Sequence, residues 1–146
     1  QRELPYIKTI NYLMAVWLQP WLEKMNADDV MYYNNGLVTE MPRSNIFIVT
    51  TTNKLVTPHQ NILQGVTRKN ILKMAAGLMA VEERDISLEE MSNAAEIFIC
   101  STTKRIMPVL SLDGKQVGNG EPGQVTKQLY QLFIQQEKEI TKQVLQ

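Results

Sequence analysis

The side chain best placed to do chemistry in this sequence is the carboxylate of Glu40. It follows a β-type run, Leu37-Val38-Thr39, and precedes an irregular connection at residues 41–44, so we expect it at a strand end beside a break in the strand pairing. Side chains at such positions often bind ligands or act in catalysis, because a rigid scaffold positions them. The ordinary alternative for a charged side chain is a solvated place at the sheet edge.

Two other stretches have the residue types to bind an anion. Gly65-Val66-Thr67 is expected to open a helix, where free backbone N–H groups, the helix dipole and the Thr67 hydroxyl favour negative charge. Ser101-Thr102-Thr103 ends an apolar run, and the hydroxyls and successive N–H groups of such a turn also form anion sites. The first stretch could equally be an ordinary helix cap, and the second a turn without a role.

The elements that position these residues follow from turn residues and apolar spacing. Asn-Gly at 35–36 and Asp-Gly at 113–114 predict hairpins. The predicted strands are residues 30–33 with 37–39, 45–51 with 54–57, 81–86, 96–100, and 106–112 with 115–117. Helices are predicted to begin at Thr9, Gly65, Ser87 and Glu121, with a kink or restart of the first at Pro20. Trp17 and Trp21, one turn apart, are expected to pack in the core or an interface.

Composition excludes several classes of partner. The 146 residues carry 15 basic and 15 acidic side chains, so no net charge would draw the chain to nucleic acid or an anionic membrane. No apolar run approaches the roughly 18 residues that a membrane helix needs, and we expect a soluble single domain. His59 has no metal-ligand partners nearby and is expected at the surface, whereas Cys100 is expected in the core of a protein from a reducing compartment. The first residue is Gln1, so the natural chain is expected to begin earlier.

The order of these pieces resembles the class IV aminotransferases, the pyridoxal 5′-phosphate (PLP) enzymes of fold type IV. The resemblance covers nearly the whole chain and rests on Lys8-Thr9-Ile10-Asn11-Tyr12-Leu13, Val38-Thr39-Glu40, Asn45-Ile46-Phe47, Ile62-Leu63-Gln64-Gly65-Val66-Thr67-Arg68, and Phe98-Ile99-Cys100-Ser101-Thr102-Thr103 running to Pro108-Val109. It implies an α/β fold of mostly antiparallel strands in a pseudo-barrel with surrounding helices. It also implies that residues 1–146 are the C-terminal PLP-binding domain, and that an N-terminal small domain, which supplies an arginine to the phosphate and part of the substrate pocket, is missing.

The resemblance assigns the central chemistry to two residues. Lys8 would form the Schiff base with PLP and then, as a free amine, move a proton between the substrate Cα and the cofactor C4′. Glu40 would face the pyridine nitrogen and keep it protonated, because a carboxylate there stabilises the positive ring that acts as electron sink. Tyr12 would lie near the phenolic oxygen of the cofactor.

The remaining site residues would bind the two anionic groups. Val66, Thr67 and Thr102 would hold the cofactor phosphate, and the turn from Ser101 through Thr102 to Thr103 would also meet the substrate carboxylate. Arg43 departs from the small residues that many relatives have there. It is expected either to contact an acidic group of the substrate or to point away as a surface residue.

The function implied by the resemblance is transamination of a branched-chain or similar amino acid with 2-oxoglutarate. An aminodeoxychorismate lyase of the same fold and a non-catalytic fragment are the alternatives, and this chain alone is expected to be a poor enzyme. The spacing from Lys8 to Asn11 resembles D-amino-acid transaminases and the lyases, whereas Asn11-Tyr12 resembles the branched-chain type. The resemblance also implies amino acid and 2-oxo acid substrates, a homodimer, a cytoplasmic location and no metal.

Overall fold

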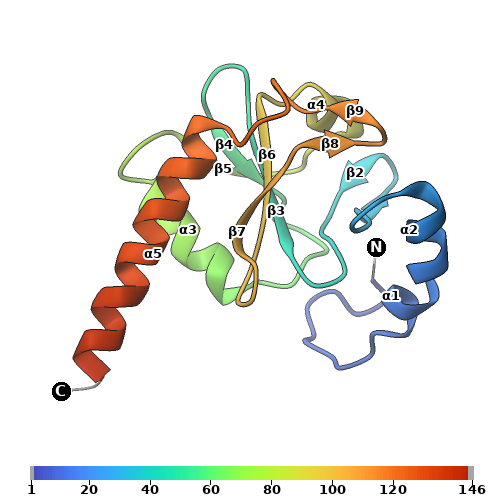
Figure 1. The fold of residues 1–146 in the computed structure, drawn as a ribbon, viewed down its shortest axis with the longest axis horizontal. Helices are drawn as coiled ribbons and strands as arrows, with labels where there is room; N and C mark the ends of the chain where they lie inside the picture. Colours follow the sequence, from blue (N-terminus) through green and yellow to red (C-terminus); the bar gives the residue numbers. More distant parts are fainter. Residues whose placement is uncertain (1, 145–146) are drawn as a thin grey trace.

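The centre of the molecule is a five-stranded sheet with strand order β5-β4-β3-β6-β7 (Figure 1). The computed structural model describes residues 2–144. The strands are β3 (Asn45–Val49), β4 (Leu55–Thr57), β5 (Val81–Glu83), β6 (Glu96–Ser101) and β7 (Arg105–Val109). All neighbouring strands pair antiparallel except β4 and β5, which are parallel. The predicted α/β class with a mostly antiparallel sheet and surrounding helices is confirmed.

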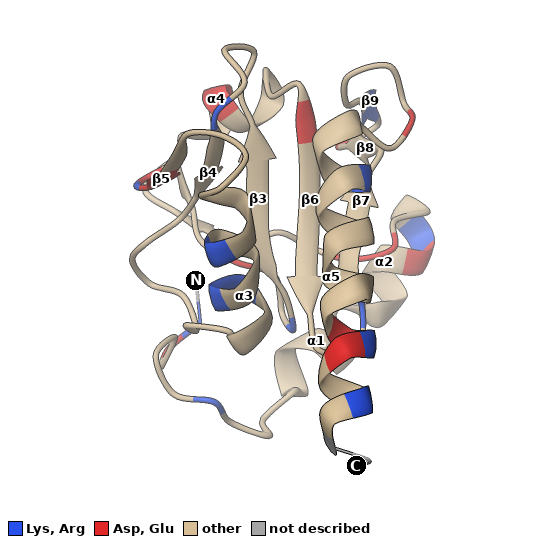
Figure 2. Ribbon diagram, turned by 90° about the vertical axis from the view of Figure 1, so that its left-hand side faces the viewer, with Lys and Arg blue, Asp and Glu red and all other residues tan. Residues whose placement is uncertain are grey.

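Two long helices cover one face of this sheet. Figure 2 shows α3 (Val66–Ala75) and α5 (Gln124–Val144) side by side in front of the strands. Phe47 of β3 and Phe98 of β6 stack beneath them, with ring centroids 5.0 Å apart. The core on this face is completed by Val49, Leu55, Ile71, Ala75, Cys100, Ile106, Leu129 and Phe133. Because strand side chains alternate, the neighbouring residues of β3 and β6 face the opposite side.

The opposite face is covered by short elements. These are the hairpin of β1 (Tyr33–Asn34) and β2 (Leu37–Val38), the helix α4 (Leu88–Ser92), and the hairpin of β8 (Ser111–Leu112) and β9 (Lys115–Gln116). The buried residues of this second core are Val38, Met41, Ile46, Ile48, Val56, Ile86, Met91, Ala94, Ile97 and Ile99. Burial of β3 and β6 on both faces explains their nearly continuous apolar sequences.

A charged side chain caps the long helix α5. The Glu96 carboxylate accepts the backbone N–H groups of Val125 (3.0 Å) and Thr126 (2.8 Å) and the Thr126 hydroxyl (2.7 Å). A negative charge at a helix N-terminus is favourable, because the free N–H groups there carry partial positive charge. A Cβ atom at Gly123 would collide with the Glu96 side chain, so this approach requires glycine.

The first helical region differs in part from the prediction. The helix does not begin at Thr9: α1 (Leu13–Trp17) follows Tyr12, whose side chain makes no capping hydrogen bond. The expected break at Pro20 is confirmed, because α2 (Gln19–Met25) starts anew with this proline in its first turn. Among residues 2–144, no helix has the length and apolar character needed to cross a bilayer.

Local turn and cap signals were good predictors of backbone geometry. Asn35 and Gly36 both have positive φ, as the predicted hairpin requires. Ser87 accepts the N–H of Glu90 at 3.0 Å, which confirms the predicted N-cap, although the Glu90 carboxylate binds Arg84 instead of completing the capping box. Several strands were predicted too long. The strand predicted at 30–33 is only β1 (Tyr33–Asn34), β3 ends at Val49, β5 ends at Glu83, and residues 106–112 divide into β7 and β8 at Leu110.

Candidate functional site

Glu40 is buried and held by two donors. Its relative exposure is only 3%. The pairing of the β1–β2 hairpin continues past β2, since the Tyr32 N–H donates to the Glu40 carbonyl oxygen at 2.8 Å. Arg2 donates from Nε to Oε1 at 2.6 Å, and the Leu63 backbone N–H donates to Oε2 at 2.9 Å. The carboxylate therefore has a fixed orientation, with lone pairs still available, since the two oxygens together can accept about four hydrogen bonds.

The segment before α3 is fixed by the same end of the sheet. Asn45, the first residue of β3, donates from Nδ2 to the Leu63 carbonyl oxygen at 2.7 Å. A Cβ atom at Gly65 would collide with Asn45 Oδ1, so only glycine permits this close approach. Glu40 and Asn45 thus hold both backbone polar groups of Leu63, and they set where α3 begins.

The start of α3 presents unpaired donors. Gly65 is the N-cap, no side chain caps the helix, and the first helical bond runs from Lys69 N–H to the Gly65 carbonyl oxygen. Within the described part of the chain, no hydrogen bond is recorded for the N–H groups of Val66 and Thr67. The Val66 side chain is 75% exposed and Thr67 only 6%, so the opening of the site lies on the Val66 side. Such a helix start attracts an anion.

The predicted hydroxyl turn lies at this same end of the sheet. Cys100 of β6 is directly opposite Asn45, and the β6–β7 turn follows immediately at residues 101–105. Ser101 Oγ accepts the Lys104 N–H at 3.1 Å and lies 3.4 Å from Thr103 Oγ1, while Thr102 and Thr103 are exposed. Because Asn45 also contacts Gly65, the structure brings this turn close to the start of α3.

Lys8 lies in an exposed loop tethered to the site at two points. Arg2 binds Glu40, and the Tyr6 hydroxyl accepts the Asn61 backbone N–H at 3.1 Å. In residues 2–144, no hydrogen bond or ion pair is recorded for Lys8, so its amine is uncommitted.

Tyr12 and Arg43, predicted separately, are brought together by the structure. The Arg43 guanidinium carbon lies 5.8 Å from the centroid of the Tyr12 ring. Residues 8–12 and the turn at 41–44 therefore meet beside the buried Glu40.

The contact partners of Glu40 were not predicted from the sequence. Arg2 lies 38 positions away from the carboxylate, and no local pattern points to such a contact. The sequence contains a weak indication that Asn45 makes a specific contact, because a buried polar residue at the start of an apolar strand usually has a hydrogen-bond partner.

Cys100 and His59 lie where the sequence predicts, in the core and at the surface. Cys100 is buried, and burial raises the pKa of its thiol to about 12. His59 is exposed, with Nδ1 3.5 Å from Asp85 Oδ1. No cluster of metal-ligating side chains occurs in the described ranges.

The chain is similar in sequence to known proteins. The family profile described as "Amino-transferase class IV" matches residues 1–112. D-alanine aminotransferase of Bacillus licheniformis is 35% identical over 126 residues, which cover 83% of this chain and 44% of that protein. The chain thus spans less than half the length of this curated relative.

Solved structures show the same fold. The crystal structure of the branched-chain amino acid aminotransferase of Escherichia coli matches with a TM-score of 0.79 and 34% identity, over 85% of this chain and 43% of that chain. The branched-chain amino acid aminotransferase of Thermobaculum terrenum, in its PLP-bound form, matches with a TM-score of 0.78 and 32% identity, over 88% and 44% of the two chains.

Proposed function

Because the chain belongs to the amino-transferase class IV family, we propose that it takes part in PLP-dependent transamination between an amino acid, branched-chain or similar, and 2-oxoglutarate. The observation that carries the proposal is the fixed, buried carboxylate of Glu40 next to a helix start with free N–H groups. PLP has a pyridine nitrogen at one end and a phosphate at the other, and these two features suit its two ends.

The residues present fit the cofactor. Glu40 would face the pyridine nitrogen and keep it protonated, and the cofactor would then supply an electron sink for the bond broken at the substrate Cα. Arg2 and the Leu63 N–H hold the carboxylate in a fixed orientation, because both donate to it. The N–H groups of Val66 and Thr67 would bind the phosphate, aided by the helix dipole.

Lys8 would be the amine that binds the cofactor covalently and afterwards moves the proton. Its lack of a recorded partner supports this role, since an amine in an ion pair would first have to leave its carboxylate. Tyr12 would lie beside the phenolic oxygen of the cofactor. The turn from Ser101 to Thr103 would bind the substrate carboxylate, and Thr102 would also contact the phosphate.

Further parts of the protein belong to the same proposal. Residues 1–146 would be the C-terminal PLP-binding domain, with an N-terminal small domain completing the pocket; the 44% coverage of D-alanine aminotransferase supports this. A cytoplasmic homodimer would be the working form. Apolar side chains exposed on α1, such as Leu13 and Trp17, support contact with a second subunit.

Borohydride reduction in the presence of PLP, followed by peptide mass analysis, tests the proposal. We expect a pyridoxyl mass on Lys8, its loss in Lys8→Arg, and its retention in the matched control Lys69→Arg, an exposed lysine on α3. A label on another lysine, or none in the wild type, would refute the proposal. Pyruvate release from aminodeoxychorismate without an amino acceptor would identify the lyase instead.

A further inference from the structure

Arg43 projects from a rigid turn. The Met41 N–H donates to the Ser44 carbonyl oxygen at 2.9 Å, and the Ser44 N–H donates back to the Met41 carbonyl oxygen at 3.5 Å, which leaves Pro42 and Arg43 as the two central residues. Proline fixes φ at the first central position. Met41 and Ser44 are buried whereas Arg43 is exposed, so the turn is anchored at both ends and presents only the arginine.

Arg43 is the one arginine of the described chain without a carboxylate partner. The other arginines pair as follows: Arg2 with Glu40, Arg68 with Glu83, Arg84 with Glu82 and Glu90, and Arg105 with Glu137. The recorded contact of Arg43 is with the Tyr12 ring, at 5.8 Å, which leaves its five N–H donors free for an anion. The attraction between a cation and the face of an aromatic ring favours this position of the guanidinium.

The position of this guanidinium relates it to the proposed substrate site. Asn45 is opposite Cys100 in the antiparallel pair of β3 and β6, so the turn at 41–44 and the turn at 101–105 lie at the same end of two adjacent strands. The second turn would bind the substrate α-carboxylate. The two cations of that segment are already paired, Lys104 with Asp29 at 3.0 Å and Arg105 with Glu137 at 2.7 Å. Because Lys8 is assigned to the cofactor in the proposed function, Arg43 is the remaining unpaired cation that the described residues place at this end of the sheet.

We propose that Arg43 is a specificity-determining residue that binds the distal carboxylate of a dicarboxylic amino acid or 2-oxo acid. This inference rests on the proposed function, and it names the residue that would distinguish the dicarboxylic substrate of that reaction from substrates with an apolar side chain. The planar guanidinium matches a carboxylate with two parallel hydrogen bonds, which an ammonium group does not reproduce. Substrates with an apolar side chain would leave Arg43 unpaired and gain nothing from it.

Binding of two unreactive acids to the PLP-loaded full chain tests the inference without depending on turnover. Glutarate carries two carboxylates and 4-methylpentanoate one, and calorimetry gives the Kd of each. In Arg43→Gln we expect glutarate to bind at least about tenfold more weakly, with 4-methylpentanoate changed by less than about twofold. Arg43→Lys should lie between Arg43→Gln and the wild type. The control Lys115→Gln removes an exposed charge on β9 and should change neither Kd.

The possible outcomes separate the two proposals. If Arg43→Gln weakens the binding of both acids equally, or does not weaken the binding of glutarate, the role of Arg43 is overturned. A pyridoxyl label on Lys8 would still support the proposed function in that case. Absence of that label in the wild type overturns both. Loss of glutarate preference in Arg43→Gln, with the label retained, supports the inference.

Discussion

The ion pair between Arg2 and Glu40 joins the start of the chain to the candidate site. Glu40 is almost fully buried and Arg2 is partly exposed, so the pair lies at the boundary between core and solvent. Arg2 also donates to the Pro5 carbonyl oxygen at 2.8 Å, which fixes the loop that carries Lys8. A buried carboxylate is stable only with such partners, because removing a charge from water costs several kcal/mol.

Replacing Arg2 by Gln should therefore destabilise the protein. We expect the free energy of unfolding to fall by about 2 kcal/mol, less than for a fully buried pair because water can reach the Arg2 side of the carboxylate. Denaturant unfolding measures the change. The double variant Arg2→Gln with Glu40→Gln is the control and should lose less than the two single changes combined, since no unpaired charge stays buried. An unchanged midpoint in Arg2→Gln would contradict the argument.

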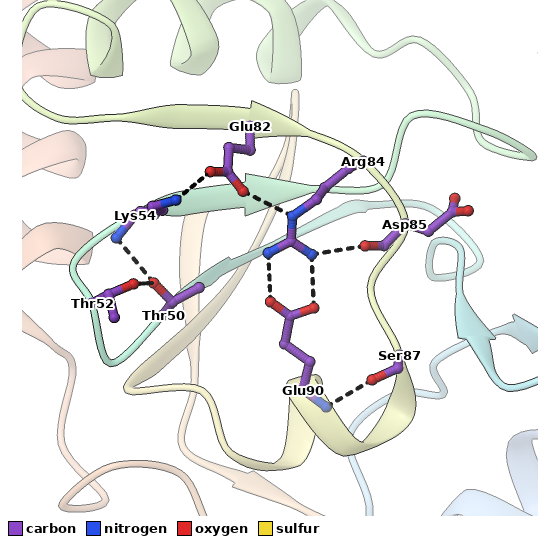
Figure 3. A network of polar contacts seen from close by, with 8 residues as sticks. All are labelled: Thr50, Thr52, Lys54, Glu82, Arg84, Asp85, Ser87 and Glu90. Carbon is purple, nitrogen blue, oxygen red and sulfur yellow. Dashed lines mark hydrogen bonds and ion pairs between the residues drawn. The ribbon is translucent and has the colours of Figure 1, made fainter.

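At the scale of elements, a network of charges joins β5 to α4. Figure 3 shows Arg84 between two carboxylates: Nη1 and Nη2 donate to Glu90 at 2.8 and 2.6 Å, and Nε donates to Glu82 at 2.8 Å. Lys54 donates to the other oxygen of Glu82 at 2.7 Å. The hydrogen bonds from Arg84 lower the pKa of Glu90, against the opposing effect of burial.

This network should contribute pH-dependent stability. A carboxyl group whose pKa is lowered on folding stabilises the protein above its unfolded pKa, near 4.3, and the contribution is lost as the pH falls through the lowered value. We expect Arg84→Gln to reduce the free energy of unfolding by less than about 1 kcal/mol near pH 7, because the groups are partly exposed. The difference from wild type should narrow below about pH 4. Urea unfolding at both pH values checks this, and a gap that persists in acid would indicate lost packing instead.

Elements defined by neighbouring residues were predictable from sequence, whereas those defined by distant contacts were not. Asn35-Gly36 and Ser87 act on their own backbone, so the hairpin and the cap followed directly. The predicted start of the first helix at Thr9 was wrong: α1 begins at Leu13, whose N–H donates to Asn11 Oδ1 at 3.1 Å. Trp17 and Trp21 are exposed, which contradicts a place in the core of the described chain.

The same distinction applies to the candidate site. The residues proposed to do chemistry could be picked out from the order of the motifs along the sequence. The structure brings the predicted turn at 101–103 close to the predicted helix start at Gly65. The sequence could not predict the contributions of Arg2, Asn45 and the backbone of Leu63, because these depend on which segments the fold places next to Glu40.

At the scale of the whole molecule, α1 and α2 lie on the side opposite α5 (Figure 1), and several of their apolar side chains are exposed. A groove of about 550 Å³ is lined by Trp17, Leu18, Trp21, Val30, Met31 and Tyr32. Trp17 is 71% exposed and Ile10 94%. Exposed apolar side chains clustered in this way mark association surfaces.

If the proposed homodimer uses this surface, a charge placed within it should weaken the dimer. We expect Trp17→Glu to raise the dimer dissociation constant by at least about tenfold, since a buried unpaired charge opposes association. Sedimentation velocity over a concentration series measures the change. Leu78→Glu, which places the same charge at a half-exposed leucine after α3, should leave association unaltered. If the two variants have the same dimer dissociation constant, the interface lies elsewhere on the protein.

The turn at residues 51–53 connects β3 to β4 at the end of β3 remote from Asn45. The chain has one cysteine, Cys100, and it is buried with a thiol that stays protonated at ordinary pH. A Thr51→Cys variant would thus offer a single reactive sulfur, suitable for attaching a dye or immobilising the protein on a support with the opposite end of the sheet facing solution.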